Sequence, residues 1–413
     1  MQVTLPPAAK LGREGGVMPF LAMLLVTHVA LAACGGLSGG DGSATVRDTL
    51  PSGVVRVTNT LPADAPPMWR LVEELRVGAV DGDGPDVFGE LEALAPLPGG
   101  GFAVIEAQAQ EVRVFGPGGE HVATHGRKGG GPGEFENAID LMLGPQERLW
   151  VADPGNVRMS VLDPVAGFVE SFPLPFPLWG FAWDGAMTAD GRILEFSFDR
   201  GQSREILRVY DLTMTQVDSI SLKEVEVFEP EDDPGIFVQD LGGGSQYMRG
   251  VPFHPSGLRY LDAQGAIWSK PRGDPDYVIR KWLPGGDTTL ILETRRPAVP
   301  VTTAERDSVI ARIRESFRRS GATAELDWSR IPAVKSAVED VFVSAEGDVW
   351  VRTPSPVAET TFDVYAPDGS YVGTAVGAAR LTHPVVRGNA FWAFVSDDFN
   401  VPYVIRARIT PTR

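Results

Sequence analysis

The stretch that decides the fold is Gly129-Gly130-Gly131-Pro132-Gly133-Glu134-Phe135, because a second version stands 47 residues earlier as Gly82-Asp83-Gly84-Pro85-Asp86-Val87-Phe88. Two more pairs of segments keep the same offset: Gly101–Val104 with Arg148–Val151, and Val112–Phe115 with Met159–Leu162. The chain therefore contains a repeated unit. A period of about 40–50 residues with short β-type runs is typical of β-propeller blades, whereas helical repeats of about 33–34 residues would show apolar residues with a period of about 3.6.

Each unit is predicted to hold four short strands. In the second unit we expect them at Ala138–Leu143, Leu149–Ala152, Val157–Leu162 and Phe168–Phe172. The turns between first and second strands are tight and carry glycine, as in Ala263-Gln264-Gly265. Glycine supplies the positive φ that such hairpin turns need.

The predicted fold is an all-β, six-bladed β-propeller over residues 68–413. Five units are expected at about 87–125, 135–176, 180–222, 250–296 and 334–376. The last three strands, Pro384–Arg387, Ala390–Ser396 and Tyr403–Ile409, lack a fourth partner. The spare strand Trp69–Val77 would supply that partner and close the ring, which removes an exposed edge. A seven-blade count stays open, because the third unit matches the pattern least well.

One segment departs from the strand pattern. Thr302 and Glu305 have capping-box spacing, and Val309, Ile313 and Phe317 recur every four residues. We predict a helical insertion over about 302–320, between blades four and five. Its apolar stripe is expected to pack on the propeller, and the alternative is a lid over the pore.

The N-terminus is predicted to be an export signal. Lys10 and Arg13 precede an apolar run from Val17 to Leu31, and the run ends in Leu31-Ala32-Ala33-Cys34. This ending resembles a bacterial lipobox, which implies that residues 1–33 are a lipoprotein signal peptide and that Cys34, the only cysteine, is acylated. An ordinary signal peptide or a short anchor stays open.

We therefore expect a lipid-anchored protein of the bacterial cell envelope, with the membrane as a partner through Cys34. Residues 34–67 are rich in Gly, Pro, Thr and Asp. That composition predicts a flexible tether without a core of its own.

Composition excludes several classes. The formal charge is 37 − 54 = −17, which argues against a nucleic-acid partner because such binding needs clustered positive charge. One cysteine cannot form a disulfide framework or a cysteine-based zinc module. A hydrophobic fraction of 43% argues against wholesale disorder.

The first two units resemble the NHL-repeat type of six-bladed propeller. The residues that carry this resemblance are Gly126–Phe135, Leu149–Arg158 and Val161–Asp163. Such propellers include bacterial surface proteins, lyases, lactonases and protein-binding modules, so the resemblance implies a fold more firmly than a function.

A binding site is expected on the face that carries the long loops. In a four-stranded blade, the first and third turns leave one face, and they are short here. The second turns and the connections between blades leave the other face, and they are long and varied. Long loops on a rigid scaffold are the usual place for binding. The candidate residues on that face are Arg127, Lys128, His254, His383 and Asp398.

Metal-binding residues are sparse. Lyases that this group resembles hold zinc through inner-strand histidines; His254 and His383 stand at such positions, but the matching residue in blade two is about Asn137. Lactonase-type propellers hold a divalent ion through carboxylates and Asn, for which Asp140, Asp184, Glu339 and Asp340 are candidates. These carboxylates can equally be solvated or stabilise turns. We predict no resident cofactor, with a divalent metal as the open alternative.

Asp153, Asn156 and Arg158 follow a strand in an Asp-Pro-Gly-Asn turn, so we interpret them as structural. No complete catalytic set is present. The sequence predicts a monomeric binding module for a protein, peptide or glycan. A metal-dependent lyase or lactonase with a site in the central channel is the alternative, and a structural envelope protein is a third possibility.

Overall fold

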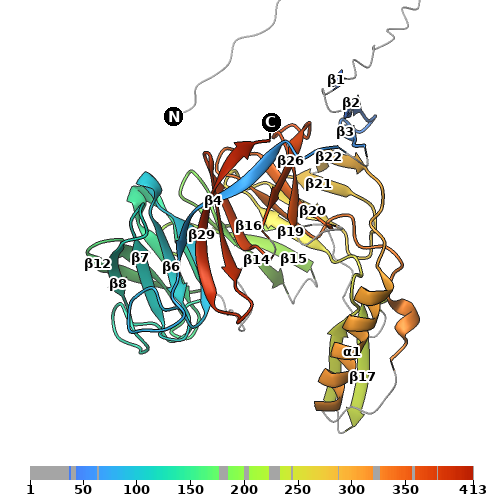
Figure 1. Ribbon diagram of the computed structural model, residues 1–413. Coiled ribbons are helices and arrows are strands. Elements are labelled where there is room, and N and C mark those ends of the chain that lie inside the picture. The colour runs from blue at the N-terminus through green and yellow to red at the C-terminus, as the bar shows by residue number, and fades with distance from the viewer. Residues whose placement is uncertain are drawn as a thin grey trace, which may run out of the picture. The chain divides into compact units, whose positions relative to one another are not determined.

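The computed structural model describes residues 37–38, 43–62, 65–175, 185–199, 204–222, 233–242, 245–286, 288–319, 326–355, 359–378 and 380–412. The chain divides into two compact units, Met1–Gly35 and Gly36–Arg413. All described residues belong to the second unit (Figure 1).

Three antiparallel sheets of four strands come from consecutive segments. Group one is β5 (Leu91–Pro96), β6 (Phe102–Glu106), β7 (Glu111–Phe115) and β8 (His121–His125). Group two is β9 (Asp140–Leu143), β10 (Leu149–Asp153), β11 (Arg158–Asp163) and β12 (Gly167–Pro173). Group three is β13 (Ala186–Met187), β14 (Ile193–Asp199), β15 (Arg204–Tyr210) and β16 (Gln216–Ser221).

The remaining strands form larger sheets and one small one. Group four is β19 (Leu258–Leu261), β20 (Ile267–Lys270), β21 (Val278–Trp282) and β22 (Thr288–Arg295); β3 (Val55–Thr60), β2 (Ala44–Thr49) and β1 (Leu37–Ser38) extend it to seven strands. Group five is β23 (Asp340–Val343), β24 (Val349–Thr353), β25 (Thr360–Tyr365) and β26 (Tyr371–Gly377). Group six is β27 (Thr382–Arg387), β28 (Ala390–Ser396) and β29 (Pro402–Pro411) with β4 (Trp69–Val77), and it shares an eight-stranded sheet with group five. β17 (Ile236–Gly242) and β18 (Ser245–Gly250) pair with each other alone.

The arrangement is all-β and propeller-like, because the hydrophobic core lies between consecutive groups rather than within one of them. One cluster joins groups one and two through residues such as Ile105 and Leu149. Comparable clusters join each later pair. A last cluster joins group six to group one, where the rings of Phe102 and Trp392 lie 5.3 Å apart. The faces of every group are thereby removed from water, which is the main stabilising contribution.

The N-terminal strand β4 completes group six, as the sequence predicts. It pairs antiparallel with β29 from Val77↔Val404 to Trp69↔Pro411 (Figure 1). The strand therefore covers an edge that the C-terminal segment would otherwise leave unpaired.

The turns divide the propeller-like body into two faces. First-to-second and third-to-fourth strand turns are short hairpins closed by bonds such as Asp262 N to Ala266 O and Gly116 N to Glu120 O. Gly265 has a φ of 79°, as the hairpin prediction requires. We call this side the short-turn face. The opposite side carries the connections between groups and the second-to-third strand turns, and we call it the long-connection face.

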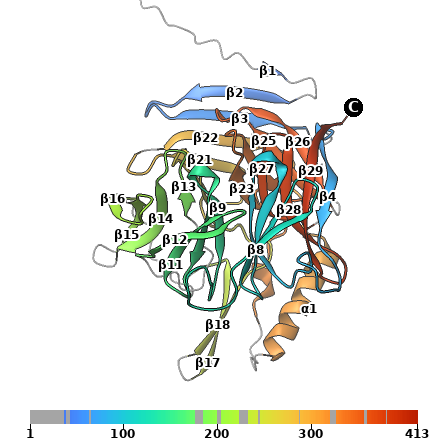
Figure 2. The ribbon, with the colours of Figure 1, turned by 90° about the vertical axis from the view of Figure 1, so that its left-hand side faces the viewer.

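The predicted tether over 34–67 is corrected by β2 and β3. β3 pairs in parallel with β22, and Figure 2 shows both added strands alongside it. Val57 is fully buried in the core between groups four and five. Asn59 is also buried: its amide donates to Gly369 O at 3.0 Å, and its oxygen accepts from Tyr371 N at 3.0 Å. The composition of the whole segment obscured the alternating pattern of the strand Val55–Thr60. The hydrophobic core around that strand is supplied by residues of groups four and five.

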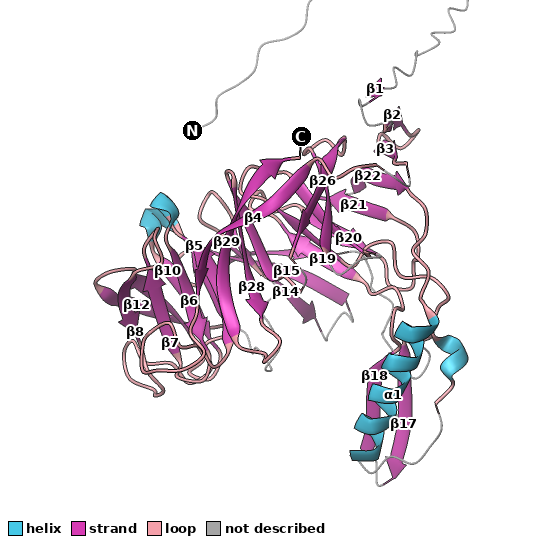
Figure 3. Ribbon diagram, viewed as in Figure 1, coloured by secondary structure: helices cyan, strands magenta, loops and turns pink. Residues whose placement is uncertain are grey.

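The helical insertion is confirmed, and its packing is corrected. α1 spans Thr303–Arg319, and the capping box forms through bonds between Thr302 and Glu305 in both directions. Its buried residues Ile313 and Phe317 pack with Phe237 of β17 and not with the six strand groups. Figure 3 shows α1 beside β17 and β18, so two separate insertions cover each other's apolar faces. Three short 3-10 turns, Pro98–Gly100, Pro145–Glu147 and Trp328–Arg330, complete the helical elements of the described chain.

Candidate functional site

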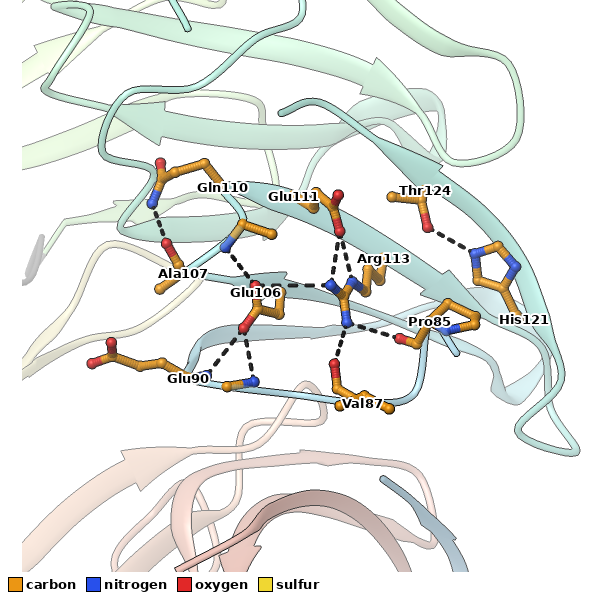
Figure 4. Close-up of polar contacts among 12 residues, drawn as sticks. Pro85, Val87, Glu90, Glu106, Ala107, Gln110, Glu111, Arg113, His121 and Thr124 are labelled. Atoms are coloured by element: carbon orange, nitrogen blue, oxygen red, sulfur yellow. Dashed lines mark hydrogen bonds and ion pairs between the residues drawn. The ribbon is translucent and has the colours of Figure 1, made fainter. Parts of the chain in front are cut away.

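A buried carboxylate fixes the connections on the long-connection face of group one to the sheet. Glu106 ends β6, and its side chain accepts bonds from Gly89 N at 2.9 Å, Glu90 N at 3.1 Å and Ala109 N at 2.7 Å (Figure 4). Arg113 lies beside it and donates to Val87 O at 2.6 Å. These contacts bind the incoming connection and the next turn to the sheet.

Asp153, 47 residues after Glu106, fixes the corresponding connections of group two to the sheet. It accepts from Glu136 N at 3.2 Å, Asn137 N at 2.9 Å, and Asn156 Nδ2 at 2.7 Å. Arg158 donates to Glu134 O at 2.5 Å, as Arg113 does to Val87 O. The structural interpretation of Asp153, Asn156 and Arg158 is therefore confirmed, and these residues form a scaffold for the loops.

A cleft of about 690 Å³ lies on the long-connection face, between groups four and five. Its walls come from the β20–β21 turn, the end of β22 and the segments that lead into and out of the α1 insertion. The charged lining residues are Asp276, Glu293, Arg295, Arg296 and Lys335. Their charges are mostly paired: Arg295 lies 3.1 Å from Glu293, and Lys335 lies 2.6 Å from Glu305.

A buried polar network forms the floor of this cleft. Arg296 Nη1 donates to Asp363 Oδ2 at 2.7 Å, and Tyr277 Oη donates to the same oxygen at 3.1 Å. Tyr365 Oη donates to Tyr277 Oη at 2.9 Å. Burial raises the pKa of Asp363, and the Arg296 guanidinium opposes that shift. Because its members are satisfied by one another, the network fixes the cleft's shape.

The channel carboxylates lie on different strands. Asp140 begins β9, and burial raises its pKa to about 6, with a smaller contribution from the charge of Glu92. Asp340 begins β23, and burial raises its pKa too, opposed by Val341 N–H, Arg352 and His383. Burial lowers the pKa of His383, and the charge of Asp340 opposes that shift.

These residues do not gather into a metal site. In the part of the chain that the structure describes, no group of three or more His, Cys, Asp or Glu side chains could hold a metal ion. Asp140 belongs to group two, whereas Glu339 and Asp340 stand at the start of group five. Asp184 and Cys34 fall outside the described residues.

The other predicted site residues are spread over the long-connection face. Arg127 is exposed and binds Glu134 at 2.6 Å, and Lys128 lies 3.7 Å from Glu136. His254 lies in the connection between β18 and β19, close to Gly235, and not at the start of an inner strand as predicted. Asp398 is exposed in the β28–β29 turn, beside a Phe399 whose side chain is 85% exposed. The face was predicted, but these residues do not converge on one site.

The raised pKa of Asp140 predicts a pH dependence of stability. The folded protein binds this proton more tightly than the unfolded chain, so the free energy of unfolding should fall as pH rises from about 4 to 6. Asp140→Asn should remove that fall and stabilise the protein at pH 7 by on the order of 1 kcal/mol, since the half-buried side chain keeps some water. Urea unfolding at several pH values measures this.

Asp163→Asn is the control, because the N–H groups of Ala166 and Val165 lower the pKa of Asp163. Its stabilising contribution is present above the unfolded pKa and is lost as pH falls, so its removal should change the slope in the opposite sense. An unchanged slope in Asp140→Asn contradicts the assignment.

Sequence reasoning missed the cleft and its network. Tyr277 and Tyr365 are 88 residues apart, and no local spacing relates them. One signal was available: β6 and β10 end in Glu106 and Asp153, whereas the corresponding strands β20 and β24 end in Lys270 and Thr353. The loop-binding carboxylate is thus absent from the two groups that border the cleft.

Comparisons with known proteins add the following. No family model matches the sequence, and no curated protein matches it. Among solved structures, a protein described as exported, from Bacteroides fragilis, is 10% identical over 86% of this chain and 99% of its own, with a TM-score of 0.46. The PQQ-bound aldose sugar dehydrogenase from Streptomyces coelicolor is 11% identical over 83% and 99%, with a TM-score of 0.43. Virginiamycin B lyase from Staphylococcus aureus is 10% identical over 77% and 94%, with a TM-score of 0.38. None of the described helices combines the length and apolar character needed to cross a membrane.

Proposed function

We propose that this chain is a lipid-anchored, exported six-bladed propeller of the NHL-repeat type that binds a protein, peptide or glycan through its long-connection face. The observation that carries the proposal is the cleft of about 690 Å³ between groups four and five. Pockets of about 300–1,000 Å³ with a few placed polar groups are typical binding sites. We expect the protein to act as a monomer, without a nucleic-acid partner.

The count of six blades rests on the strand groups. Each of the six groups contributes four antiparallel strands if β4 is counted with group six. The two larger sheets arise by parallel pairing at outer strands: β3 extends β22, and β4 meets β26 over only Trp69 and Arg70. Outer-strand pairing of this kind joins blades without changing their number.

The predicted anchor Cys34 stands three residues before β1 along the chain, and β1 begins at Leu37 and pairs with β2. Cys34→Ala should therefore release the protein from membranes into the soluble fraction, measured by fractionation and immunoblotting. A variant that stays with the membrane contradicts lipid anchoring.

The binding face can be tested with a matched pair of exposed valines. Val334 lines the cleft and is 40% exposed, and Val165 lies in a short-turn-face hairpin and is 69% exposed. A photoreactive side chain at position 334 should form a covalent product with the ligand in intact cells, whereas the same group at 165 should not. Equal labelling from both positions, or none from 334, contradicts the proposal.

A further inference from the structure

A second hollow lies at the opposite end of the strand groups. It has a volume of about 380 Å³ and is lined by residues of the first strands β5, β9, β13, β19 and β27. These residues lie toward the ends that lead into the short turns: Leu94 to Pro96 of β5, Leu141 to Leu143 of β9, and Val385 and Arg387 of β27. The hollow is therefore distinct from the cleft on the long-connection face.

Most of the described side chains that line it are apolar, and none of them is a carboxylate. The apolar side chains include Leu94, Leu141, Met142, Leu143, Met187 and Val385. None of the lining residues that the structure describes is Asp or Glu, although the chain as a whole has 54 acidic and 37 basic residues. The charged lining residues are two arginines, Arg259 and Arg387. Among the described residues, the lining itself therefore holds two cations and no anion.

The two arginines differ in how they are held. Arg259 Nη1 donates to Glu205 Oε2 at 2.8 Å, and its guanidinium lies 3.7 Å from the ring centre of Phe196. Arg387 is exposed, and within the described chain its side chain has no hydrogen-bond or ion-pair partner. The carboxylate of Glu346, in the turn between β23 and β24 of group five, accepts from Gly388 N at 2.7 Å. Arg387 is therefore the cation available to a ligand.

We propose that this hollow binds a small organic molecule with an apolar body and one carboxylate, which pairs with Arg387. The apolar walls favour burial of a hydrocarbon or aromatic body, since a pocket of this size with few polar groups is typical of small-ligand sites. A guanidinium matches a carboxylate through two parallel hydrogen bonds. A neutral ligand could not form that ion pair, and the positive charge of Arg387 would repel a protonated amine.

Isothermal titration of the full-length chain tests this, with Cys34→Ala to prevent acylation. The probes are octanoate, octanol and octylamine, which share one apolar body, and dodecanoate, which distinguishes a small acid from a fatty-acid source. Octanoate should bind at least tenfold more tightly than octanol, a difference of about 1.4 kcal/mol, and octylamine should not bind. Dodecanoate should bind more weakly than octanoate if the hollow takes a small acid, and more tightly if it takes a fatty acid; either result agrees with an apolar carboxylate.

Variants locate the site. Arg387→Gln should weaken octanoate binding about tenfold or more and leave octanol binding unchanged. Met187→Trp, which fills the hollow, should weaken both. Arg192→Gln removes an equal charge from an exposed arginine on the same face, paired with Asp190, and should change neither. Equal affinities for octanoate and octanol, an unaffected Arg387→Gln, or no binding of any probe would each overturn the proposal, whatever the outcome at the long-connection face.

Discussion

Replacing Asp153 with alanine should lower the free energy of unfolding by about 3–5 kcal/mol. The side chain is fully buried, and its two oxygens accept from the backbone N–H groups of Glu136, Asn137 and Asn156. Without it these donors lose their partners inside the protein, and each unsatisfied buried donor costs about 1–3 kcal/mol. Chemical unfolding of the purified protein measures the change.

Two variants set the scale of this result. Asp153→Asn keeps an acceptor oxygen and should cost less than the alanine change. Asp190→Ala removes a carboxylate that is 63% exposed, so its effect should stay within about 0.5 kcal/mol. An Asp153→Ala variant as stable as the Asp190→Ala variant would show that water replaces the carboxylate, and the assigned scaffold role would be wrong.

Removal of residues 1–60 should destabilise the protein by about 4 kcal/mol or more, whereas removal of residues 1–36, which end before β1, should leave its stability unchanged. The longer deletion takes away β3, and with it the buried Val57 and the three bonds of Asn59 to Thr45, Gly369 and Tyr371. Burial of a Val side chain is worth about 1.5–3 kcal/mol, and the unmade hydrogen bonds add to that. Comparison of the two deletions by urea unfolding separates a structural strand from a tether.

The longer deletion also uncovers the edge of β22. An unpaired edge strand favours association between molecules, so that variant should aggregate at concentrations at which the shorter deletion stays monomeric. Asn59→Ala provides a milder version, with an expected loss of about 2 kcal/mol. If both deletions unfold at the same urea concentration, β3 does not contribute to the body as described.

Much of the fold was predictable because it is repeated locally. The 47-residue offset, the glycine turns and the strand Trp69–Val77 are each properties of one short segment, and the structure has the strands and turns where they indicate. The capping box of Thr302 and Glu305 was likewise readable, since both residues lie within one helical turn.

The packing partners were not predictable in the same way. The stripe of Ile313 and Phe317 indicated that α1 buries one face, but not that Phe237, 76 residues before Ile313, covers it. Val55–Thr60 indicated a strand, but its core is supplied by β22 and by residues of group five. The five candidate residues lie on one face but do not form one site: Arg127, Lys128, His254, His383 and Asp398. The face follows from the order of the turns along the chain, whereas a site also requires the side chains to point toward one another.

The sequence by itself determined the repeat, the propeller-like all-β architecture, the helix and its start, and the face that carries the long connections, since periodicity and turn chemistry act over a few residues. Only the tertiary structure decided the rest. It made β3 part of the body, placed α1 on β17 and β18, built the cleft over Tyr277, Arg296 and Asp363, and left Arg387 without a carboxylate partner in the described chain. Those features depend on contacts between segments tens to hundreds of residues apart, which no local pattern encodes.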